Sequence, residues 1–154
     1  MRIISGVNKG RNLVDLGKGD PLANLRPTSD RVRESIFNLI IGGRFGNKLE
    51  NCYILDMFAG TGALGLEALS RGARSVLFVD NGQRAIQLLR KNISICGMEN
   101  KATIVKTDAT KKLPIPQKNS FDLVFIDPPY RKGLGLRALK ILTKYELINK
   151  ETVI

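Results

Sequence analysis

The stretch that decides the fold reads Tyr53-Ile54-Leu55-Asp56-Met57-Phe58-Ala59-Gly60-Thr61-Gly62-Ala63-Leu64-Gly65. Its apolar first half, residues 53–58, is typical of a buried β-strand, and a turn of small residues, 59–62, follows it. An apolar-periodic helix is expected over 62–71. Glycines let a ligand approach the backbone and a helix N-terminus offers free N–H groups, so this unit predicts a nucleotide-binding site.

The same strand–helix pattern continues downstream. Further strands are expected at 75–79, 102–105 and 121–126, helices at 83–96 and 134–146, and the start of a fifth strand at 152–154. Repeated strand–helix units predict an α/β fold of Rossmann-like type, with a mainly parallel sheet flanked by helices. Because such a sheet normally needs its fifth strand and a cover for its edge, we expect the C-terminal strands to be missing from this sequence.

The chain before this core is basic and poor in apolar residues. Short strands are expected at 2–4 and 12–16, in a flap of residues 1–25 that must pack on the main body because it cannot fold alone. Thr28 or Ser29 is expected to cap a helix that ends at Gly42-Gly43. We therefore divide the chain into a basic flap and helix, residues 1–50, packed on a core, 51–154, as effectively one domain.

Composition narrows the function. The 154 residues carry 25 lysines and arginines against 14 acids, a net charge of +11, which favours a polyanionic partner such as nucleic acid. The absence of histidine and of paired cysteine spacing argues against a zinc site and against serine or cysteine triads, so no metal is expected. The two cysteines, Cys52 and Cys96, are predicted to be reduced and partly buried.

The chain shows no signal peptide and no apolar run of membrane-spanning length, which predicts a soluble, cytoplasmic protein. Arg26, Arg31 and Arg33 cluster at the start of the first helix, where the helix dipole is unfavourable for cations. They form either a solvated face or a cluster that faces an anion.

Acidic residues stand where each of the four predicted strands ends. They are Asp56, Asp80, Asp108 and Asp127. Ligands bind at the carboxyl ends of the strands in open parallel sheets, so four such residues on one edge predict a site there.

The glycine turn alone is ambiguous. Residues 60–65 match the dinucleotide fingerprint, with Asp80 at the position of the ribose-binding acid. Asp56 lies where it would repel a pyrophosphate but would suit the cationic groups of S-adenosylmethionine. No residue set suited to hydride chemistry accompanies the turn, so a methyltransferase is favoured over a nicotinamide-dependent oxidoreductase.

Asp127-Pro128-Pro129-Tyr130 is the most specific motif. Two prolines after a strand fix an extended turn that can aim the Asp127 carboxylate and carbonyl oxygens at one point, beneath the flat ring of Tyr130. A flipped-out base with an exocyclic amine needs such acceptors and such a stacking surface.

At these residues the chain resembles the class I, S-adenosylmethionine-dependent amino-methyltransferases of nucleic acids. The blocks at 1–6, 9–11, 25–34 and 56–62 resemble more narrowly the bacterial RsmD family, which methylates N2 of a guanine in 16S ribosomal RNA. The resemblance covers essentially the whole chain, and the family continues through a fifth strand to a closing hairpin that is absent here.

The resemblance implies roles for particular residues. Those of the cofactor site are Asp56, Phe58, Gly60, Thr61, Gly62, Asp80, Asn81, Asp108 and Ala109. Those that hold the guanine are Asp127, Pro128, Pro129 and Tyr130. Those near RNA are Lys9, Arg11, Arg26, Thr28 and Arg31. The implied partner is 16S ribosomal RNA in the small subunit or its assembly intermediate, and a monomer is expected, with no membrane partner.

Three alternatives stay open at this point. The turn chemistry does not separate a guanine N2 from an adenine N6, so an amino-methyltransferase acting on another RNA or on DNA adenine fits as well. A nicotinamide-dependent oxidoreductase and a non-catalytic RNA-binding module are the other two.

Overall fold

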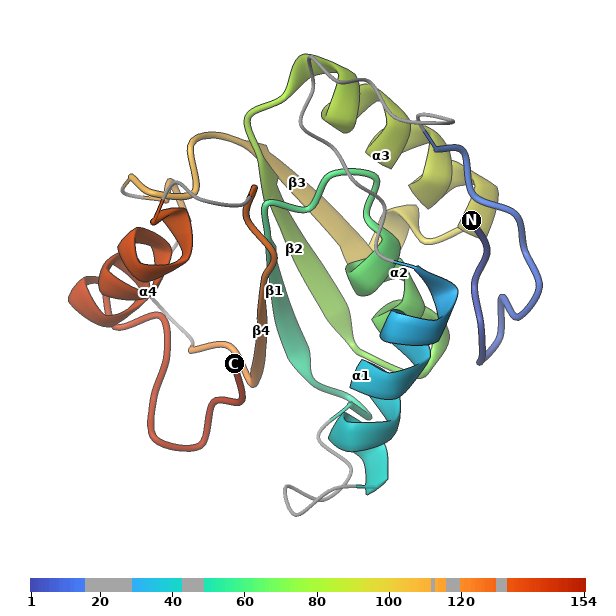
Figure 1. Ribbon diagram of the computed structural model, residues 1–154, viewed down its shortest axis with the longest axis horizontal. Helices are drawn as coiled ribbons and strands as arrows, with labels where there is room; N and C mark the ends of the chain where they lie inside the picture. Colours follow the sequence, from blue (N-terminus) through green and yellow to red (C-terminus); the bar gives the residue numbers. More distant parts are fainter. Residues whose placement is uncertain (16–28, 43–48, 112, 116–119, 130–132) are drawn as a thin grey trace.

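The computed structural model describes residues 1–15, 29–42, 49–111, 113–115, 120–129 and 133–154 (Figure 1). The elements follow the order α1 (Asp30–Gly42), β1 (Tyr53–Met57), α2 (Ala63–Ser70), β2 (Ser75–Asp80), α3 (Gln83–Cys96), the 3-10 turn η1 (Glu99–Lys101), β3 (Ala102–Lys106), β4 (Leu123–Ile126) and α4 (Leu134–Lys144). The four strands and the helices predicted for residues 53–146 are all present, with ends shifted by two residues at most. The α/β prediction is confirmed.

The four strands form one parallel sheet in the order β3-β2-β1-β4. Strand β1 lies between β2 and β4, with Met57 opposite Val79 on one side and Ile126 on the other. Beyond β4, Val153 forms a single parallel bridge with Leu123, at the place where the sequence predicts a fifth strand.

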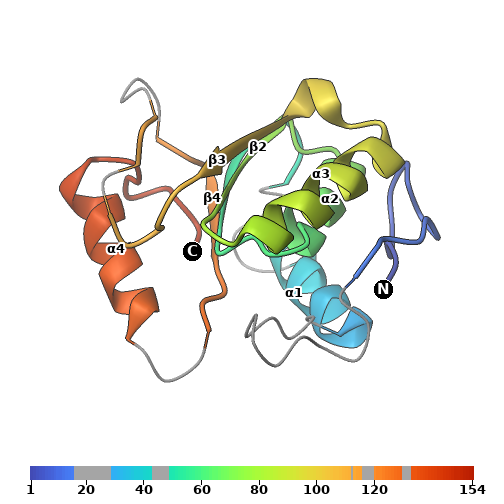
Figure 2. The same ribbon diagram turned by 90° about the horizontal axis from the view of Figure 1, so that it is seen from above.

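Helices cover both faces of the sheet. Figure 2 shows α4 on one side and α1, α2 and α3 on the other. The strand residues alternate between two apolar cores accordingly, because successive side chains point to opposite faces. Ile54, Phe78 and Phe125 pack toward α1–α3, whereas Leu55 and Val124 pack toward α4.

The helix ends agree in part with the sequence. Ser29 Oγ accepts a hydrogen bond from the N–H of Val32 at 3.3 Å, so Ser29 caps α1, while Thr28 lies outside the described residues. Helix α3 ends at Gly97, whose φ of 63° is the left-handed conformation that glycine adopts most readily.

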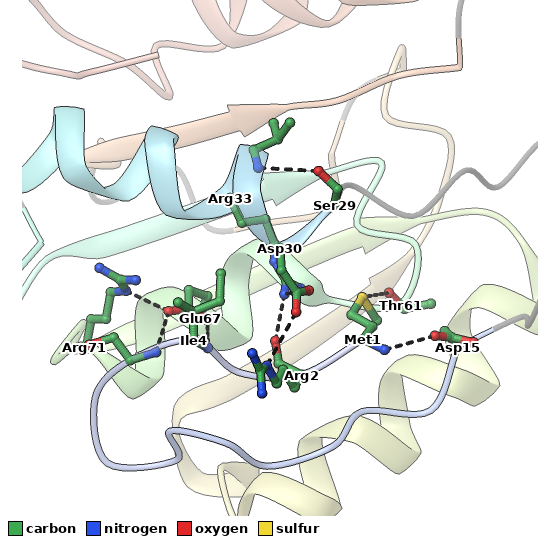
Figure 3. Close-up of polar contacts among 12 residues, drawn as sticks. Met1, Arg2, Ile4, Asp15, Ser29, Asp30, Arg33, Thr61, Glu67 and Arg71 are labelled. Atoms are coloured by element: carbon green, nitrogen blue, oxygen red, sulfur yellow. Dashed lines mark hydrogen bonds and ion pairs between the residues drawn. The ribbon is translucent and has the colours of Figure 1, made fainter.

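The N-terminal flap has less strand structure than predicted. Its described part forms one antiparallel bridge, Arg2 with Asn12, rather than two strands. Its backbone also bonds to side chains of the core: the carboxylate of buried Glu67 accepts the N–H groups of Ile4 and Ser5 at 2.7 and 3.0 Å (Figure 3). The described part of the flap therefore packs on α2 of the core.

Arg33 follows neither of its two predicted interpretations, a solvated face or an anion-facing cluster. Its side chain is completely buried and donates from Nη2 to the carbonyl of Arg2 and to Asp30, at 2.6 and 2.7 Å (Figure 3). Its Nε and Nη1 have no hydrogen-bond partner within the described ranges. Burial lowers the pKa of its guanidinium, and the neighbouring Asp30 and Glu67 oppose that shift. Arg33 thus ties the start of α1 to the flap.

The cysteines are as predicted. Cys52 and Cys96 are both free and buried. Burial raises the pKa of the Cys52 thiol to about 12, so this thiol is protonated and unreactive at neutral pH.

Candidate active site at the carboxyl edge of the sheet

The four predicted acids lie at one edge of the sheet. Asp56 is the fourth residue of β1 and Asp80 the last of β2, while Asp108 and Asp127 follow β3 and β4 within two residues. The parallel register aligns these strand ends, with Met57 of β1 opposite Val79 and Ile126. Because β1 is the central partner of β2 and β4, the turn after β1 lies between Asp80 and Asp127.

The turn after β1 has an unusual backbone. Phe58, Gly60 and Gly62 all have positive φ, of 61°, 56° and 82°. This conformation is uncommon for an aromatic residue such as Phe58 and is found most often at functional sites. The N–H of Gly62 bonds to the carbonyl of Ala59 at 2.8 Å, which closes the turn before α2 begins.

Close packing explains two of the glycines. A Cβ on Gly62 would lie 2.3 Å from Cδ1 of Leu89 in α3, and a Cβ on Gly65 would lie 2.3 Å from Cε1 of Phe78 in β2. Gly65 therefore lets α2 approach the sheet closely, which is the role of the third glycine in dinucleotide-type turns.

Asp80 holds the glycine turn from the neighbouring strand. Its Oδ2 accepts the N–H of Gly60 at 2.8 Å and its Oδ1 accepts the N–H of Gly82 at 2.7 Å. A carboxylate has about four acceptor positions, so both oxygens keep capacity for the hydroxyl groups of a ribose. The half-buried Asp80 fits the predicted ribose-binding role while also shaping the turn.

Asp56 lies beneath the turn and is 1 % exposed. Its Oδ2 accepts the N–H of Gly65, in the first turn of α2, at 3.0 Å. A carboxylate of the chain itself therefore occupies part of the helix end that a pyrophosphate would use in a dinucleotide enzyme. This contact argues against pyrophosphate binding there, and so against a nicotinamide-dependent oxidoreductase.

The pKa of Asp56 is shifted by its burial and by its charged neighbours. Burial raises its pKa to about 7, the hydrogen bond from Gly65 opposes the shift, and the charges of Asp127 and Asp80 add to it. The same electrostatic influence indicates that three carboxylates from β1, β2 and the turn after β4 lie near one another. Their combined field favours a cationic ligand group over an anionic one.

We expect the stability of the protein to depend on pH through Asp56. The carboxyl binds its proton more tightly in the folded state, so its contribution is fully present below pH ~4 and is lost as the pH rises through about 7. Relative to Asp56→Asn, the wild-type free energy of unfolding should fall by up to about 4 kcal/mol over this range. Urea unfolding of both proteins at pH 4, 5.5 and 7 measures the difference; a constant difference would contradict this assignment.

Asp108 and its neighbours follow β3. Oδ1 of Asp108 accepts hydrogen bonds from the hydroxyl and the N–H of Thr110, at 2.7 and 2.9 Å. These bonds, the hydroxyl bond first, hold the pKa of Asp108 below its usual range, with smaller help from Lys111 and Arg137. The side chain is therefore an ionised acceptor, as an adenine amino group requires, and the adjacent Ala109 is buried.

The Asp-Pro-Pro turn projects from the end of β4. Asp127 is exposed, whereas Pro128 and Pro129 are half-buried. Cγ of Pro128 lies 3.6 Å from the position of a Cβ on Gly135, so the first turn of α4 packs against the motif. Tyr130, predicted to be the stacking ring, lies outside the described residues.

The other predicted residues are distributed as follows. Asn81, next to Asp80, is exposed, and so are Lys9 and Arg31. Arg11 is also exposed, but its Nη1 donates to the carbonyl of Ile95 near the C-terminal end of α3, where a cation is favourable. Arg26 and Thr28 lie outside the described residues.

Two polar residues that the structure shows to be buried are not among those predicted from the sequence. Glu67 and Asn92 are both 0 % exposed and join the flap to α2 and α3. The available signal was their spacing, because each falls within the apolar pattern of its helix, as Asn92 does between Leu89 and Ile93. A polar residue at a buried position predicts a hydrogen-bonded contact.

Comparison with known proteins identifies the family. The family model described as "Conserved hypothetical protein 95" matches residues 1–154. The chain is 34 % identical to "Ribosomal RNA small subunit methyltransferase D" of Haemophilus influenzae, over 100 % of this chain and 76 % of that protein. This chain belongs to the RsmD family. The resemblance drawn from the sequence motifs is confirmed.

Two further proteins are similar to this chain, one in sequence and one in fold. YlbH of Bacillus subtilis is 37 % identical, over 98 % of this chain and 78 % of its own length. The solved structure of yhhF from Escherichia coli superposes with a TM-score of 0.78 at 31 % identity, over 99 % of this chain and 76 % of that one. In the described part of the chain, no helix has the length and apolar character needed to cross a membrane.

Proposed function

We propose that this protein transfers a methyl group from S-adenosylmethionine to the exocyclic N2 of a guanine in 16S ribosomal RNA. The observation that carries the proposal is the pairing of β4 with β1, which brings the Asp127-Pro128-Pro129 turn next to the glycine turn. A base held by the first turn would then face a cofactor held by the second.

The residues present fit S-adenosylmethionine. Asp80 offers free acceptor positions for ribose hydroxyls, and the ionised Asp108 offers an acceptor for the adenine amino group. The charges of Asp80 and Asp127 act on Asp56, and the three carboxyl groups together would suit the positive charges of the methionine end. Phe58, Thr61 and Gly62 would shape that end of the site. When bound, this cofactor supplies an electrophilic methyl group.

The chain's own part in the reaction is to hold the amine. The Asp127 carboxylate and the carbonyl oxygens of the Asp-Pro-Pro turn would accept the N–H hydrogens of the guanine amine, which directs the nitrogen lone pair to the methyl carbon. Once methylated, the amine nitrogen would give up one proton. Asp127 is exposed, so that proton can pass to solvent without a dedicated buried base.

The ribosomal RNA substrate is supported by the chemistry of the surface and by the relatives' names. The flap carries exposed Lys9 and Arg11, and the chain has a net charge of +11, which suits a dense array of phosphates. Relatives from Haemophilus influenzae and Buchnera are named for the small ribosomal subunit. We propose the small subunit, or its assembly intermediate, as partner of a monomeric protein in the cytoplasm.

Transfer of a labelled methyl group tests this function. Purified protein is incubated with labelled S-adenosylmethionine and, in parallel, with unmethylated small subunits, naked 16S RNA, or DNA. We expect the label in N2-methylguanosine from small-subunit RNA. Label in N6-methyladenine, or none from a folded protein that binds the cofactor, would refute the proposed substrate.

A further inference from the structure

Asn92 joins the flap, which is proposed to contact RNA, to the glycine turn, which is proposed to hold the cofactor. It lies in α3 with 0 % of its surface exposed. Its Oδ1 accepts the N–H of Val14 in the flap at 2.7 Å, and its Nδ2 donates to the carbonyl of the same residue at 2.9 Å. Nδ2 also donates to the carbonyl of Thr61 in the glycine turn, at 2.9 Å.

These three bonds use both hydrogens of the side-chain amide. One hydrogen goes to the flap and the other to the turn, so the two segments are held by one group with no hydrogen left over. These bonds are partly shielded from water, and leaving the buried amide of Asn92 without partners would be costly, so each contact constrains its segment. A second contact between the segments supports this arrangement: the hydroxyl of Thr61 lies 3.9 Å from Sδ of Met1 (Figure 3).

The turn also rests on the same helix. A Cβ on Gly62 would lie 2.3 Å from Leu89, one helical turn before Asn92, so the turn contacts α3 through both residues. Helix α3 is thus the platform on which the glycine turn and the flap meet.

We infer that Asn92 is a positioning residue that fixes the glycine turn and the basic flap in one arrangement, so that the cofactor site and the RNA-facing flap form together. The identity of the two ligands rests on the proposed function, whereas the coupling of turn and flap rests on the contacts alone. Asn92 touches no reacting atom in this scheme and acts through Thr61 and Val14.

The chain offers a matched control in Ser70, which is 2 % exposed. Its Oγ accepts the N–H of Asn8 at 3.0 Å and donates to the carbonyl of Ser5 at 2.6 Å. Ser70→Ala therefore removes two hydrogen bonds that anchor the flap, as Asn92→Leu does, but none that reaches the glycine turn.

The first measurement needs no ligand. Amide hydrogen exchange of residues 59–62 is compared in wild type, Asn92→Leu and Ser70→Ala, at equal distance from each melting temperature. We expect exchange in the turn to be about tenfold faster in Asn92→Leu and unchanged in Ser70→Ala. Asn92→Ser, which keeps a small polar group, replaces Asn92→Leu if the latter does not fold. Equal protection of the turn in wild type and the Asn92 variant, or equal loss in both variants, would overturn the inference.

The second measurement adds the ligands. For S-adenosylmethionine, we expect Kd to rise about tenfold in Asn92→Leu and to stay within twofold in Ser70→Ala. For small-subunit RNA, both variants should bind more weakly, because both loosen the flap. A cofactor Kd that is the same in wild type and Asn92→Leu would overturn the role at the cofactor site.

The two experiments separate the inference from the proposed function. If the wild type binds no S-adenosylmethionine, the proposed function fails, while the exchange data still decide whether Asn92 positions the turn. If the wild type binds S-adenosylmethionine and methylates RNA, but hydrogen exchange in the turn is the same in wild type and Asn92→Leu, only the inference fails.

Discussion

Replacing Asp127 with alanine is expected to reduce methyl transfer by at least about a thousandfold, while the Kd for S-adenosylmethionine stays within about threefold of wild type. The exposed carboxylate lies in the turn after β4, and we propose that it accepts a hydrogen bond from the amine of the base. Its loss removes an acceptor that orients the nucleophile, and it leaves the bonds of Asp80 to the glycine turn intact. Single-turnover transfer to small-subunit RNA measures the first quantity and calorimetric titration the second.

Glu99→Ala is the matched control for Asp127. Glu99 is also an exposed acid, but it lies in η1 before β3, at the opposite edge of the sheet. Its replacement makes the same change in net charge, so it corrects for a general electrostatic effect on RNA binding. If Asp127→Ala transfers methyl groups as fast as Glu99→Ala does, the amine is held by other groups.

Replacing Asp80 with alanine is expected to raise the Kd for S-adenosylmethionine by about a hundredfold or more. The change removes the proposed ribose acceptor, and it also frees the N–H groups of Gly60 and Gly82 that the carboxylate holds at 2.8 and 2.7 Å. Asp80→Asn keeps an acceptor and the size of the side chain, so its Kd should lie between those of wild type and alanine. Titration calorimetry of the three proteins gives the order.

Asp122→Ala separates this effect from a loss of stability. Oδ2 of Asp122 accepts the N–H of Tyr53 at 2.7 Å, a bond of the same kind at the amino end of β1. We expect Asp122→Ala to lower the melting temperature without changing the cofactor Kd. If the two alanine variants lose cofactor affinity equally, Asp80 has no specific place in the site.

The core of the fold could be predicted because its patterns are local. Apolar runs mark β1 and β2, and Gly97 marks the end of α3, where a left-handed residue is needed. The parallel sheet then follows from the alternation of strands and helices, and it places the four acids on one edge. Strand β4 begins two residues later than predicted, at Leu123 rather than Phe121, because strand ends are set by pairing with the neighbouring strand.

The contacts of the flap and of the buried polar residues could not be predicted, because their partners are distant in the sequence. The N-terminal backbone bonds to Glu67 and Ser70, which lie more than sixty positions away. The sequence predicts that Arg33 lies on a solvated face or in a cluster that faces an anion, because a sequence shows charge but not burial. In the structure it is buried and pairs with Asp30 and the carbonyl of Arg2.

In the site, too, features set by local sequence could be predicted and features set by tertiary packing could not. The sequence predicts that Asp56, Asp80, Asp108 and Asp127 lie at the carboxyl edge, because each lies near or just after the end of a strand of the parallel sheet. It did not predict that Asp56 would be nearly inaccessible and bonded to Gly65, since this requires the close approach of α2 to the sheet. Asp56 therefore supports the glycine turn through its hydrogen bond to Gly65 and adds to the electrostatic potential of the site. Asp80 and Asp108 are the more accessible hydrogen-bond acceptors for the proposed cofactor.

The most direct test of the central claim is the nucleoside content of 16S ribosomal RNA in cells that lack this protein. Mass spectrometry of the digested RNA should show the loss of one N2-methylguanosine. Expression of the wild-type protein should restore it, whereas expression of the Asp127→Ala variant at the same level should not. An unchanged N2-methylguanosine content in the deletion strain, or full restoration by Asp127→Ala, would contradict the account.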